Sequence, residues 1–468
     1  MVPKPTEIGE ALERFLRSAF SIREGDSGFD RDAQLYDSGF VDSAGVVELI
    51  DFLESTFDVG LQDDDVFSDE FTTINGISAI VHRRLATRVS PDEATGTDMS
   101  GVRPFVYETD LRQVADLHRL VFGRAQHRAP GQFDRYVGDI FLDNPWRDDE
   151  LPSLVYEDDE KRIIGFLGVM PRPMVMNGLP LRVAIASQFM VHPHRRGRVG
   201  LQLARAFFSG AQDLSLTEGM GLVRTIWEGL GGTTLLLYSI RWTRPLRPGR
   251  FVPSFLARHG TASIVARALT PVCVAIDGLL GQLPQWPFRL AAPRAAGEEL
   301  TESAFLACLS EVSRGRWLGP RYDERSARWL FAILADRKDR GRLRKALVRG
   351  AAGEVAGYYL YYLNPAAISE VVQVFARDGA MPDVLDHLFH DAWAQGSVAV
   401  SGQLDPASLQ AFCQARCLLH GSGGSWILAH SKRPECLECF ERGHALLTRL
   451  EGEWWVGGIH PSSDPTWR

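Results

Sequence analysis

Residues 187–208 read SQFMVHPHRRGRVGLQLARAFF and pass from a strand-like apolar run, through a turn rich in Arg and Gly, into a pattern with helical apolar spacing. A strand that enters a helix through such a turn places free backbone N–H groups beside guanidinium groups. This arrangement suits an anionic diphosphate. A basic surface turn without a ligand is the alternative explanation of the same residues.

The segments on either side, within residues 103–250, alternate between strand and helix patterns. The expected strands are apolar and are separated by turn signals such as NGLP. Their mixture of hairpin and crossover connections predicts an α/β or α+β domain. The expected strands cover residues 152–157, 162–176, 181–193, 213–218 and 233–242, and the expected helices cover residues 110–122, 201–210 and 222–231.

The segment GEVAGYYLYYLNP repeats the pattern of KRIIGFLGVMPRP when Gly357 is laid on Gly165. A strand, a loop, a helix and a further strand then follow in the same order, which indicates an internal duplication. The loop of the second copy, FARDGAMPDV, lacks the arginines, and its Asp378 and Asp383 would repel a diphosphate. We therefore expect a degenerate second lobe that completes the sheet, the substrate cleft or a dimer contact.

Together with the following DLSLTEGMGLVRTIWEGLGG, residues 187–208 resemble the pyrophosphate-binding region of the GNAT acyltransferase superfamily. The family loop reads Arg/Gln-x-x-Gly-x-Gly/Ala before a helix, and here Arg198 stands where the first glycine is expected. A side chain there would either crowd the diphosphate of coenzyme A or add a positive charge beside it. The resemblance assigns these residues to the loop: Arg195, Arg196, Gly197, Arg198, Val199 and Gly200.

The same resemblance implies acyl transfer from a thioester to an amine, with the carbonyl group polarised by a strand amide, so that few side chains are obligatory. The family often has a tyrosine general acid where this chain has Trp227, whose residue type favours a core position. Tyr238, on the next expected strand, is a candidate substitute. Glu218, at the end of its expected strand, is the candidate general base for the incoming amine.

The acidity of the chain belongs to residues 1–85, which hold eighteen Asp and Glu against seven Lys and Arg, so that their net charge is −11 and the remainder carries +3. Apolar residues at helical spacing predict helices over residues 7–20, 46–57 and 74–85, and these make a small all-α bundle. Its central segment GFVDSAGVVELI places Ser43 at the start of the second helix. A serine in that position is also an ordinary helix N-cap.

The whole of residues 1–85, with LYDSGFVDSAGVVELIDFLESTFDV at its centre, resembles an acyl or peptidyl carrier protein. The resemblance implies that Ser43 carries 4′-phosphopantetheine, attached by a phosphopantetheinyl transferase and loaded by an adenylating ligase. A phosphodiester at a helix N-terminus is stabilised by free N–H groups and by the helix dipole. Glu48, Asp51 and Glu54 would then pair with basic patches on partners, or they form a solvated face.

Residues 86–102 lose apolar periodicity and gain Ser, Thr, Gly and Asp, which is typical of a linker. The apolar segment 261–283 is interrupted by Arg267, Pro271 and Asp277, so we expect a buried or interfacial helix and no membrane span. We expect a multidomain chain with these borders: an all-α carrier bundle over 1–85, a linker over 86–102, a GNAT-like α/β lobe with a mixed sheet over 103–250, a linker helix region over 251–299, and a second, degenerate GNAT-like lobe over 300–457.

Several classes of protein are disfavoured by composition. The chain lacks the basic footprint of a nucleic-acid binder. Its first residues lack a signal-peptide pattern, so we expect a cytoplasmic protein, in which six cysteines do not make a disulfide framework. Cys413-x3-Cys417 and Cys436-x2-Cys439 come near a zinc spacing, but free cysteines on a helix face also pack as small apolar residues, and we assign no metal.

Coenzyme A and a loaded carrier present the same pantetheine thioester, so fusion of a carrier to a GNAT domain raises the effective concentration of the thioester at the site. We therefore expect an acyltransferase of natural-product biosynthesis that transfers an acyl group from Ser43 to an amine, or another nucleophile, of a small-molecule acceptor. The alternatives are a carrier and docking protein with inactive GNAT-like lobes, and an N-acetyltransferase that uses acetyl-coenzyme A.

Overall fold

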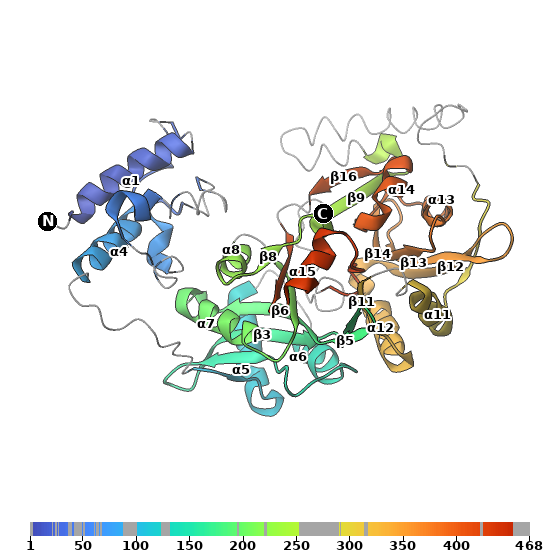
Figure 1. Cartoon of the computed structure of the whole chain (residues 1–468), viewed down its shortest axis with the longest axis horizontal. Helices are drawn as coiled ribbons and strands as arrows, with labels where there is room; N and C mark the ends of the chain where they lie inside the picture. The colour runs from blue at the N-terminus through green and yellow to red at the C-terminus, as the bar shows by residue number, and fades with distance from the viewer. Residues whose placement is uncertain are drawn as a thin grey trace.

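The structure is a computed structural model that describes residues 3–20, 22–23, 26, 28–35, 40–41, 49, 52–59, 61, 65, 68–87, 101–122, 132–193, 196–219, 222–251, 290, 292–312, 317–421 and 425–452. Figure 1 shows the N-terminal helices followed by two lobes, each built around a sheet. No helix within these described ranges is long and apolar enough to cross a membrane. The apolar segment 261–283 lies outside them.

The N-terminal helices have a hydrophobic core of their own. α1 (Pro5–Ala19) packs against α4 (Ile74–Thr87), and residues 52–57 between them are also helical. The two helices approach closely at Gly9, where an added Cβ would lie 3.2 Å from the Ser78 Oγ. Helices therefore occur where the apolar periodicity predicts them. The core contains Ile8, Leu12, Leu16, Val41, Leu49, Leu53, Phe71, Ile74, Ile77, Ile80 and Val81.

The first lobe is built on a mixed sheet, whose order among the described residues is β1-β2-β3-β6-β7-β17-β8. At its centre β3 pairs with β6 in antiparallel fashion, and β6 pairs with β7 in parallel. α5 (Tyr107–Phe122) and α7 (Arg196–Phe208) pack on β3. The strands are β1 (Val102–Pro104), β2 (Leu154–Glu157), β3 (Ile163–Pro171), β6 (Val183–Val191), β7 (Leu214–Gly219), β8 (Thr233–Thr234) and β17 (Trp426–Ser431).

The second lobe repeats this arrangement. Its sheet has the order β10-β12-β13-β14-β15-β9-β16 among the described residues, with β13 and β14 antiparallel and β14 and β15 parallel. α13 (Met381–Ala394) packs on β13, as α7 packs on β3. The strands are β9 (Ile240–Pro245), β10 (Ala296–Glu299), β12 (Arg342–Arg349), β13 (Val355–Leu363), β14 (Ile368–Ala376), β15 (Ala399–Gln403) and β16 (Leu418–Gly421).

Strand register supports the duplication that the sequence indicates. Gly165 pairs with Val191 in the first sheet, and Gly357 pairs with Ala376 in the second. The parallel ladder begins with Val183 and Leu214 in the first sheet, and with Ile368 and Ala399 in the second. These anchor positions are equally far apart on β6 and on β14, so both halves have the same topology.

The two halves exchange one strand each. β9 follows β8 in the chain but pairs with β15 in the second sheet, whereas β17 comes from the C-terminal half and pairs with β7 in the first sheet. The single strand predicted over 233–242 is wrong for this reason. After Thr234 the chain leaves the first sheet, turns through η4 (Leu237–Ser239), and enters the second sheet at Ile240. Each sheet is therefore completed by the other half of the chain.

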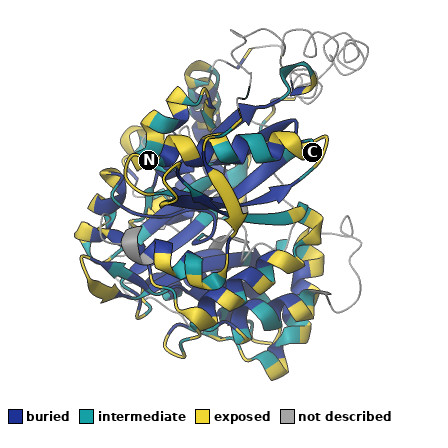
Figure 2. Ribbon diagram, turned by 90° about the vertical axis from the view of Figure 1, so that its right-hand side faces the viewer, coloured by how far each residue is buried: buried dark blue, intermediate teal, exposed yellow. Residues whose placement is uncertain are grey.

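A small third sheet joins the halves again, because β11 (Leu318–Pro320) pairs with β4 (Met174–Met176), which forms a hairpin with β5 (Leu179–Leu181). Figure 2 shows that the strands are mostly buried, while the helices expose their outer faces. The remaining elements are η1 (Asp69–Thr72), α6 (Gln132–Val137), η2 (Gly138–Leu142), α8 (Leu222–Gly229), α11 (Glu302–Val312), α12 (Glu324–Asp336), η5 (Lys338–Arg340), η6 (Pro406–Ser408), α14 (Leu409–Gln414) and α15 (Pro434–Glu441).

The four cysteines of the predicted zinc spacing lie in different environments. α14 ends before Cys417, so the predicted helix that carries both Cys413 and Cys417 on one face is too long. Cys413 is exposed, while Cys417 is buried in the core of the second lobe. Cys436 and Cys439 belong to the larger core that spans both lobes. Among the residues that the structure describes, no group of His, Cys, Asp and Glu side chains is arranged to hold a metal.

Two glycines mark equivalent helix–sheet contacts, and their replacement is expected to destabilise the fold. A Cβ at Gly165 would lie 2.7 Å from the Val199 Cγ1, and a Cβ at Gly357 would lie 2.1 Å from the Phe375 carbonyl oxygen. We expect Gly165→Ala to lower the free energy of unfolding by about 1–3 kcal/mol, and Gly357→Ala to lower it further, because the obstacle there is backbone. Urea denaturation measures both changes.

Gly421 provides the control for this prediction. An added Cβ at Gly421 meets no atom within 4 Å, so Gly421→Ala is expected to change the free energy of unfolding by less than about 0.5 kcal/mol. If all three variants have the same free energy of unfolding as the unmodified protein, the predicted steric conflict at Gly165 and Gly357 is contradicted.

Candidate active site

The parallel strands β6 and β7 separate partway along their length. Their ladder joins Val183–Ile185 to Leu214–Leu216, but β6 continues to Val191 and β7 continues to Gly219. β6 also carries a bulge at the start of this separation, where Gln188 adopts a φ of 51° and the register with β3 shifts. A bulge bends and twists a strand, which favours the separation of its neighbour. The result is a split in the first sheet.

α7 begins at Arg196, near the end of this split, so its first turn contains residues that the sequence assigned to the diphosphate loop. Arg195 lies outside the described residues, as do the side chains of the next three residues, so Arg196, Gly197 and Arg198 are placed by their backbone alone. Val199 and Gly200 are buried, and the Val199 side chain packs on Gly165 of β3. The strand and the helix therefore follow each other as predicted, but the helix begins at Arg196 and not at residue 201.

Glu218 lies near the end of β7 on the face that looks toward the second lobe. Its side chain is only 11% exposed, and its Oε1 accepts a hydrogen bond of 2.9 Å from the Ser425 hydroxyl. The Arg449 Nη2 lies 4.0 Å from the same oxygen, and the Arg449 side chain is 6% exposed. Burial lowers the pKa of Arg449 to about 10. A buried carboxylate and a buried guanidinium thus face each other.

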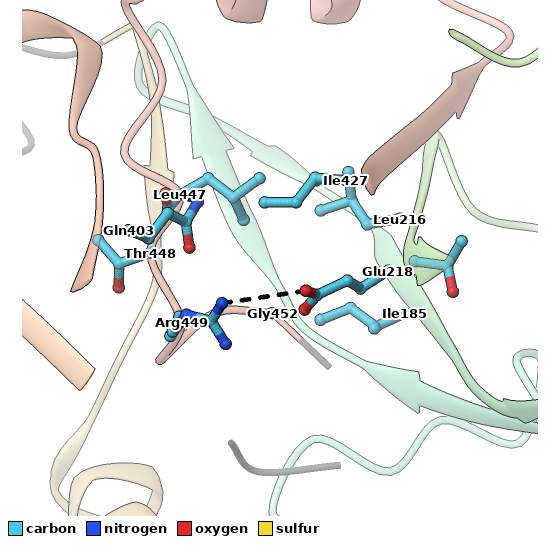
Figure 3. Close-up of a pocket in the computed structure, with 10 residues that line it drawn as sticks. Ile185, Leu216, Glu218, Gln403, Ile427, Leu447, Thr448, Arg449 and Gly452 are labelled. Carbon is cyan, nitrogen blue, oxygen red and sulfur yellow. Dashed lines mark hydrogen bonds and ion pairs between the residues drawn. The ribbon is translucent and has the colours of Figure 1, made fainter. Parts of the chain in front are cut away.

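These two side chains line a small pocket between the lobes, with a cavity volume of about 20 Å³. Figure 3 shows Arg449 and Glu218 across this pocket from each other, with apolar side chains beside them. The lining comes from both sheets and from the segment after β17: Ile185, Leu216, Thr217, Glu218, Gln403, Ile427, Leu447, Thr448, Arg449 and Gly452. The strand exchange brings these residues together.

The duplication relates the two sides of this pocket. From the register of the parallel ladders, Gln403 of β15 is the counterpart of Glu218 of β7. The Gln403 Nε2 donates a hydrogen bond of 3.2 Å to the Leu447 carbonyl oxygen. A neutral amide therefore stands in the second lobe where the first lobe has a carboxylate, so the lobes are chemically unlike at their equivalent positions.

β14 and β15 also pair only over Ile368–Glu370 and Ala399–Ser401 and then separate, which gives the second sheet a split of its own. The residues beside this second split are more polar than those beside the first. The counterparts of Ile185 and Ile427 are Glu370 and Arg241, respectively. The Arg241 Nη2 lies 4.0 Å from the Glu370 Oε1, and both residues are buried. An apolar chain that entered the second split would lie against these two charged groups and remove them from their polar surroundings. Because the burial of ionised groups in apolar surroundings is costly, the second split is unsuited to an apolar chain. The first split has the apolar walls.

Tyr238 lies in η4 and not on a strand, and it is not among the residues that line the pocket of Glu218. It is 1% exposed in η4, its hydroxyl donates a hydrogen bond of 2.8 Å to the Ala445 carbonyl oxygen, and it accepts one of 3.2 Å from the Ala445 N–H. This hydroxyl ties the strand crossover to the C-terminal segment. Trp227 is buried, and its ring packs edge-on against Phe208, which is a core position.

Sequence reasoning missed the residues that hold the C-terminal side of the pocket. Glu451 is 1% exposed and accepts hydrogen bonds from the Tyr322 hydroxyl, the Gln373 amide, and both the N–H and the hydroxyl of Thr448. Burial raises the pKa of Glu451. The Thr-x-x-Glu spacing of residues 448–451 resembles a helix capping box. This spacing is the sequence feature from which the hydrogen-bonded pair could have been predicted.

Arg172 lies beside this network and links it to the first lobe. Its Nη2 donates a hydrogen bond of 3.1 Å to the Leu450 carbonyl oxygen, and its guanidinium stacks 4.6 Å from the Trp146 ring centroid. Burial lowers the pKa of Arg172. The segment that carries Arg449 is therefore fastened to both lobes.

The remaining predicted site residue, Ser43, lies outside the described residues, as do Glu48 and Asp51. Among its neighbours, Val41 is buried and its N–H donates a hydrogen bond of 3.0 Å to the Leu35 carbonyl oxygen. Glu54 is exposed and its Oε1 accepts a hydrogen bond from the Leu61 N–H. Val41 and Leu49, on either side of Ser43, belong to the core of the N-terminal helices.

Two mixed sheets of equal topology, a diverging parallel strand pair, and a helix that begins at the divergence define an α/β protein with two similar lobes. No family model matches the chain, and no curated protein matches it.

The chain is similar to several solved structures. One is a protein of unknown function from Enterococcus faecalis V583, described as a probable N-acyltransferase, with TM-score 0.47 and 11% identity over 70% of this chain and 72% of that chain. Another is a GCN5-related N-acetyltransferase from Anabaena variabilis, with TM-score 0.47 and 12% identity over 71% and 73% of the respective chains. A third is Saccharomyces cerevisiae N-myristoyltransferase with bound myristoyl-CoA and inhibitors, with TM-score 0.41 and 9% identity over 70% and 79%. At these scores and identities the likenesses do not assign an activity to this chain.

Proposed function

We propose that the chain is an acyltransferase of small-molecule biosynthesis, in which a thioester carried on Ser43 enters the split of the first lobe and an amine attacks it. The observation that carries this proposal is the buried Glu218 carboxylate, which lines a pocket beside the diverging strands β6 and β7. A carboxylate within reach of an incoming amine is suited to accept its proton.

The split between β6 and β7 suits the thioester end of a 4′-phosphopantetheine arm. Ser43 would hold the phosphate end, and the separated edges of β6 and β7 would receive the narrow pantetheine chain beside the apolar Ile185 and Leu216. A loaded arm supplies a thioester: the new C–N bond forms as the C–S bond breaks, and the sulfur leaves as the thiol of the arm. The N-terminus of α7 would face any diphosphate of coenzyme A, which presents the same thioester.

The side chains around the pocket have separable roles in this proposal. Glu218 takes the proton that the amine releases. Ser425 orients the Glu218 carboxylate through its hydrogen bond, and Arg449 balances the charge of that carboxylate from 4.0 Å. Ser425 and Arg449 are buried and the Glu218 side chain is 11% exposed, so little water would reach the thioester to hydrolyse it.

Glu218→Gln tests the proposed role of this carboxylate. Chain acylated on Ser43 should transfer its acyl group to an amine about 10²- to 10⁴-fold more slowly after this substitution, because the proton acceptor is lost. Single-turnover mass spectrometry of the acylated protein measures the rate. Glu228→Gln is the matched control, since the Glu228 side chain is 40% exposed in α8 and pairs with Arg224.

Two outcomes would contradict the proposal. If transfer requires Ser43 but Glu218→Gln and Arg198→Ala leave its rate unchanged, the first lobe is a docking scaffold. If a chain that lacks residues 1–90 retains full activity with acetyl-coenzyme A, the protein is an N-acetyltransferase that does not need its N-terminal bundle.

A further inference from the structure

A second cavity, of about 310 Å³, lies within the first lobe, and none of its lining residues lines the pocket of Glu218. The start of α5, the end of η2, residues 147–153 and the end of β3 enclose it. Its volume is within the range of small-molecule sites, whose walls are mostly apolar with a few polar groups. η2 is a π-helical turn, a rare conformation that often occurs at functional sites. The cavity is therefore a candidate ligand site.

Part of the wall of this cavity is aromatic. Phe105 and Phe141 line it, and both rings make edge-on contacts with Phe166, with centroids 5.4 and 6.1 Å from the Phe166 centroid. Leu142 and Val169 add aliphatic surface. Aromatic rings prefer offset or edge-on contacts with one another, so a ligand that contains an aromatic ring would fit these walls well.

Two hydroxyl groups also belong to the wall. Ser153 is 8% exposed, and its Oγ accepts a hydrogen bond of 3.0 Å from the Val169 N–H. Within the part of the chain that the structure describes, the Ser153 hydroxyl has no acceptor for its proton, and the half-buried Tyr107 hydroxyl has none either. A carbonyl oxygen of a ligand would accept a hydrogen bond from Ser153 in place of water.

The rim of the cavity is acidic. Glu108 is exposed there, and the Asp149 side chain is 91% exposed. A third carboxylate, Asp148, is paired with Arg182 at 2.6 Å. Like charges repel, so the rim disfavours an anionic ligand and favours a group that donates hydrogen bonds. An ammonium group would suit the rim but offers no acceptor to the hydroxyl protons, whereas an amide has both a carbonyl oxygen and N–H donors.

We propose that this cavity binds a small aromatic carboxamide. The carbonyl oxygen of the ligand accepts a hydrogen bond from the Ser153 hydroxyl, its N–H₂ group faces the carboxylates of the rim, and its ring lies against Phe105 and Phe141. The Tyr107 hydroxyl gives the amide a second polar partner. This inference is independent of the proposed acyl transfer, because no residue of the cavity has a role in that reaction.

Phenylacetamide, phenylacetate and phenethylamine are matched probes, since they share a benzyl group and end in a neutral, an anionic and a cationic group. Titration of the full chain, followed by ligand-observed NMR, measures the three Kd values. We expect phenylacetamide to bind most tightly and phenylacetate most weakly. Ser153→Ala should weaken the binding of phenylacetamide by about 2- to 10-fold, the value of one hydrogen bond between uncharged groups, and should leave that of phenethylamine unchanged.

The ratio of the two affinities within one variant is insensitive to any loss of folded protein, which matters because Ser153 also holds the Val169 N–H. Leu142→Trp tests the location. Leu142 is half-buried at the end of η2, so a larger side chain there should fill the cavity and abolish the binding of phenylacetamide. Leu179→Trp is the control, because Leu179 is 65% exposed on β5 and does not line the cavity.

Three results would overturn the proposal. If phenylacetate or phenethylamine binds at least as tightly as phenylacetamide, the carboxamide class is wrong. If Leu142→Trp leaves the affinity unchanged, the probe binds elsewhere. If none of the three probes binds at millimolar concentration, the cavity is not a site for ligands of this size. None of these results bears on acyl transfer.

Discussion

Ser43→Ala protein is expected to remain unmodified when it is incubated with coenzyme A and a broad-specificity phosphopantetheinyl transferase, and to form no acylated product afterwards. The unmodified chain should gain the mass of one phosphopantetheine under the same conditions. The physical reason is that a single hydroxyl is proposed to hold the arm, and tethering keeps the thioester at a high effective concentration near the first lobe. Intact-mass measurement reads the modification, and product analysis reads the transfer.

Ser27→Ala is a suitable control for this experiment, because it removes another serine hydroxyl from the N-terminal module and should leave the mass gain intact. A thermal unfolding curve of Ser43→Ala should match that of the unmodified chain within the small effect of a lost helix cap, about 1 kcal/mol. An unmodified chain that gains no mass, or a Ser43→Ala chain that gains it, would remove the basis for a carrier role of the bundle.

Glu451→Ala is expected to cause the largest loss of stability among single substitutions at the lobe junction. The carboxylate accepts hydrogen bonds from Tyr322, Gln373 and Thr448, and its negative charge faces the buried Arg172. Removing one member of a buried charged network leaves the others unsatisfied, which costs about 3–5 kcal/mol. The free energy of unfolding from urea denaturation, followed by tryptophan fluorescence, measures this loss.

Glu451→Gln should lower the free energy of unfolding less than Glu451→Ala does, because the amide oxygen can still accept a hydrogen bond. Some loss is expected, because the amide N–H₂ group would face other hydrogen-bond donors. Glu441→Ala is the control: Glu441 is an exposed carboxylate at the end of α15, and its loss should change the stability by less than about 0.5 kcal/mol. A loss below about 1 kcal/mol for Glu451→Ala would show that the network contributes little to holding the C-terminal segment.

Local patterns predicted much of the secondary structure. The apolar spacing of α1 and α4 is a property of neighbouring residues, so these helices occur where the sequence predicts them. The likeness of the two halves could be predicted because both have a glycine at the equivalent position, Gly165 and Gly357. The structure gives the reason: a Cβ added at either residue would lie less than 3 Å from an atom of a neighbouring strand or helix, so only glycine fits there. The strand–loop–helix over residues 187–208 was predictable for the same local reason.

The candidate site was predictable only in part. Glu218 was identified because it ends a strand that follows the diphosphate loop, and that is a local signal. Its proximity to Arg449 was not, because 230 positions of chain lie between them and no periodic pattern marks which residues of distant segments will meet. Tyr238 was named as a candidate acid from its place on an expected strand, but its hydroxyl is bound to the backbone of Ala445.

The types of helix and strand, their order and their repetition follow from local sequence, because helical and strand periodicity are properties of neighbouring residues. The pairing of the strands does not follow from local sequence and is seen only in the folded chain. The apolar pattern of a strand specifies which of its faces is buried, but it does not specify the strand with which it pairs. The exchange of β9 and β17 between the sheets therefore could not be predicted from the sequence of either strand. That exchange builds the pocket, since it places Ile427 beside Glu218 and carries the chain on to Arg449.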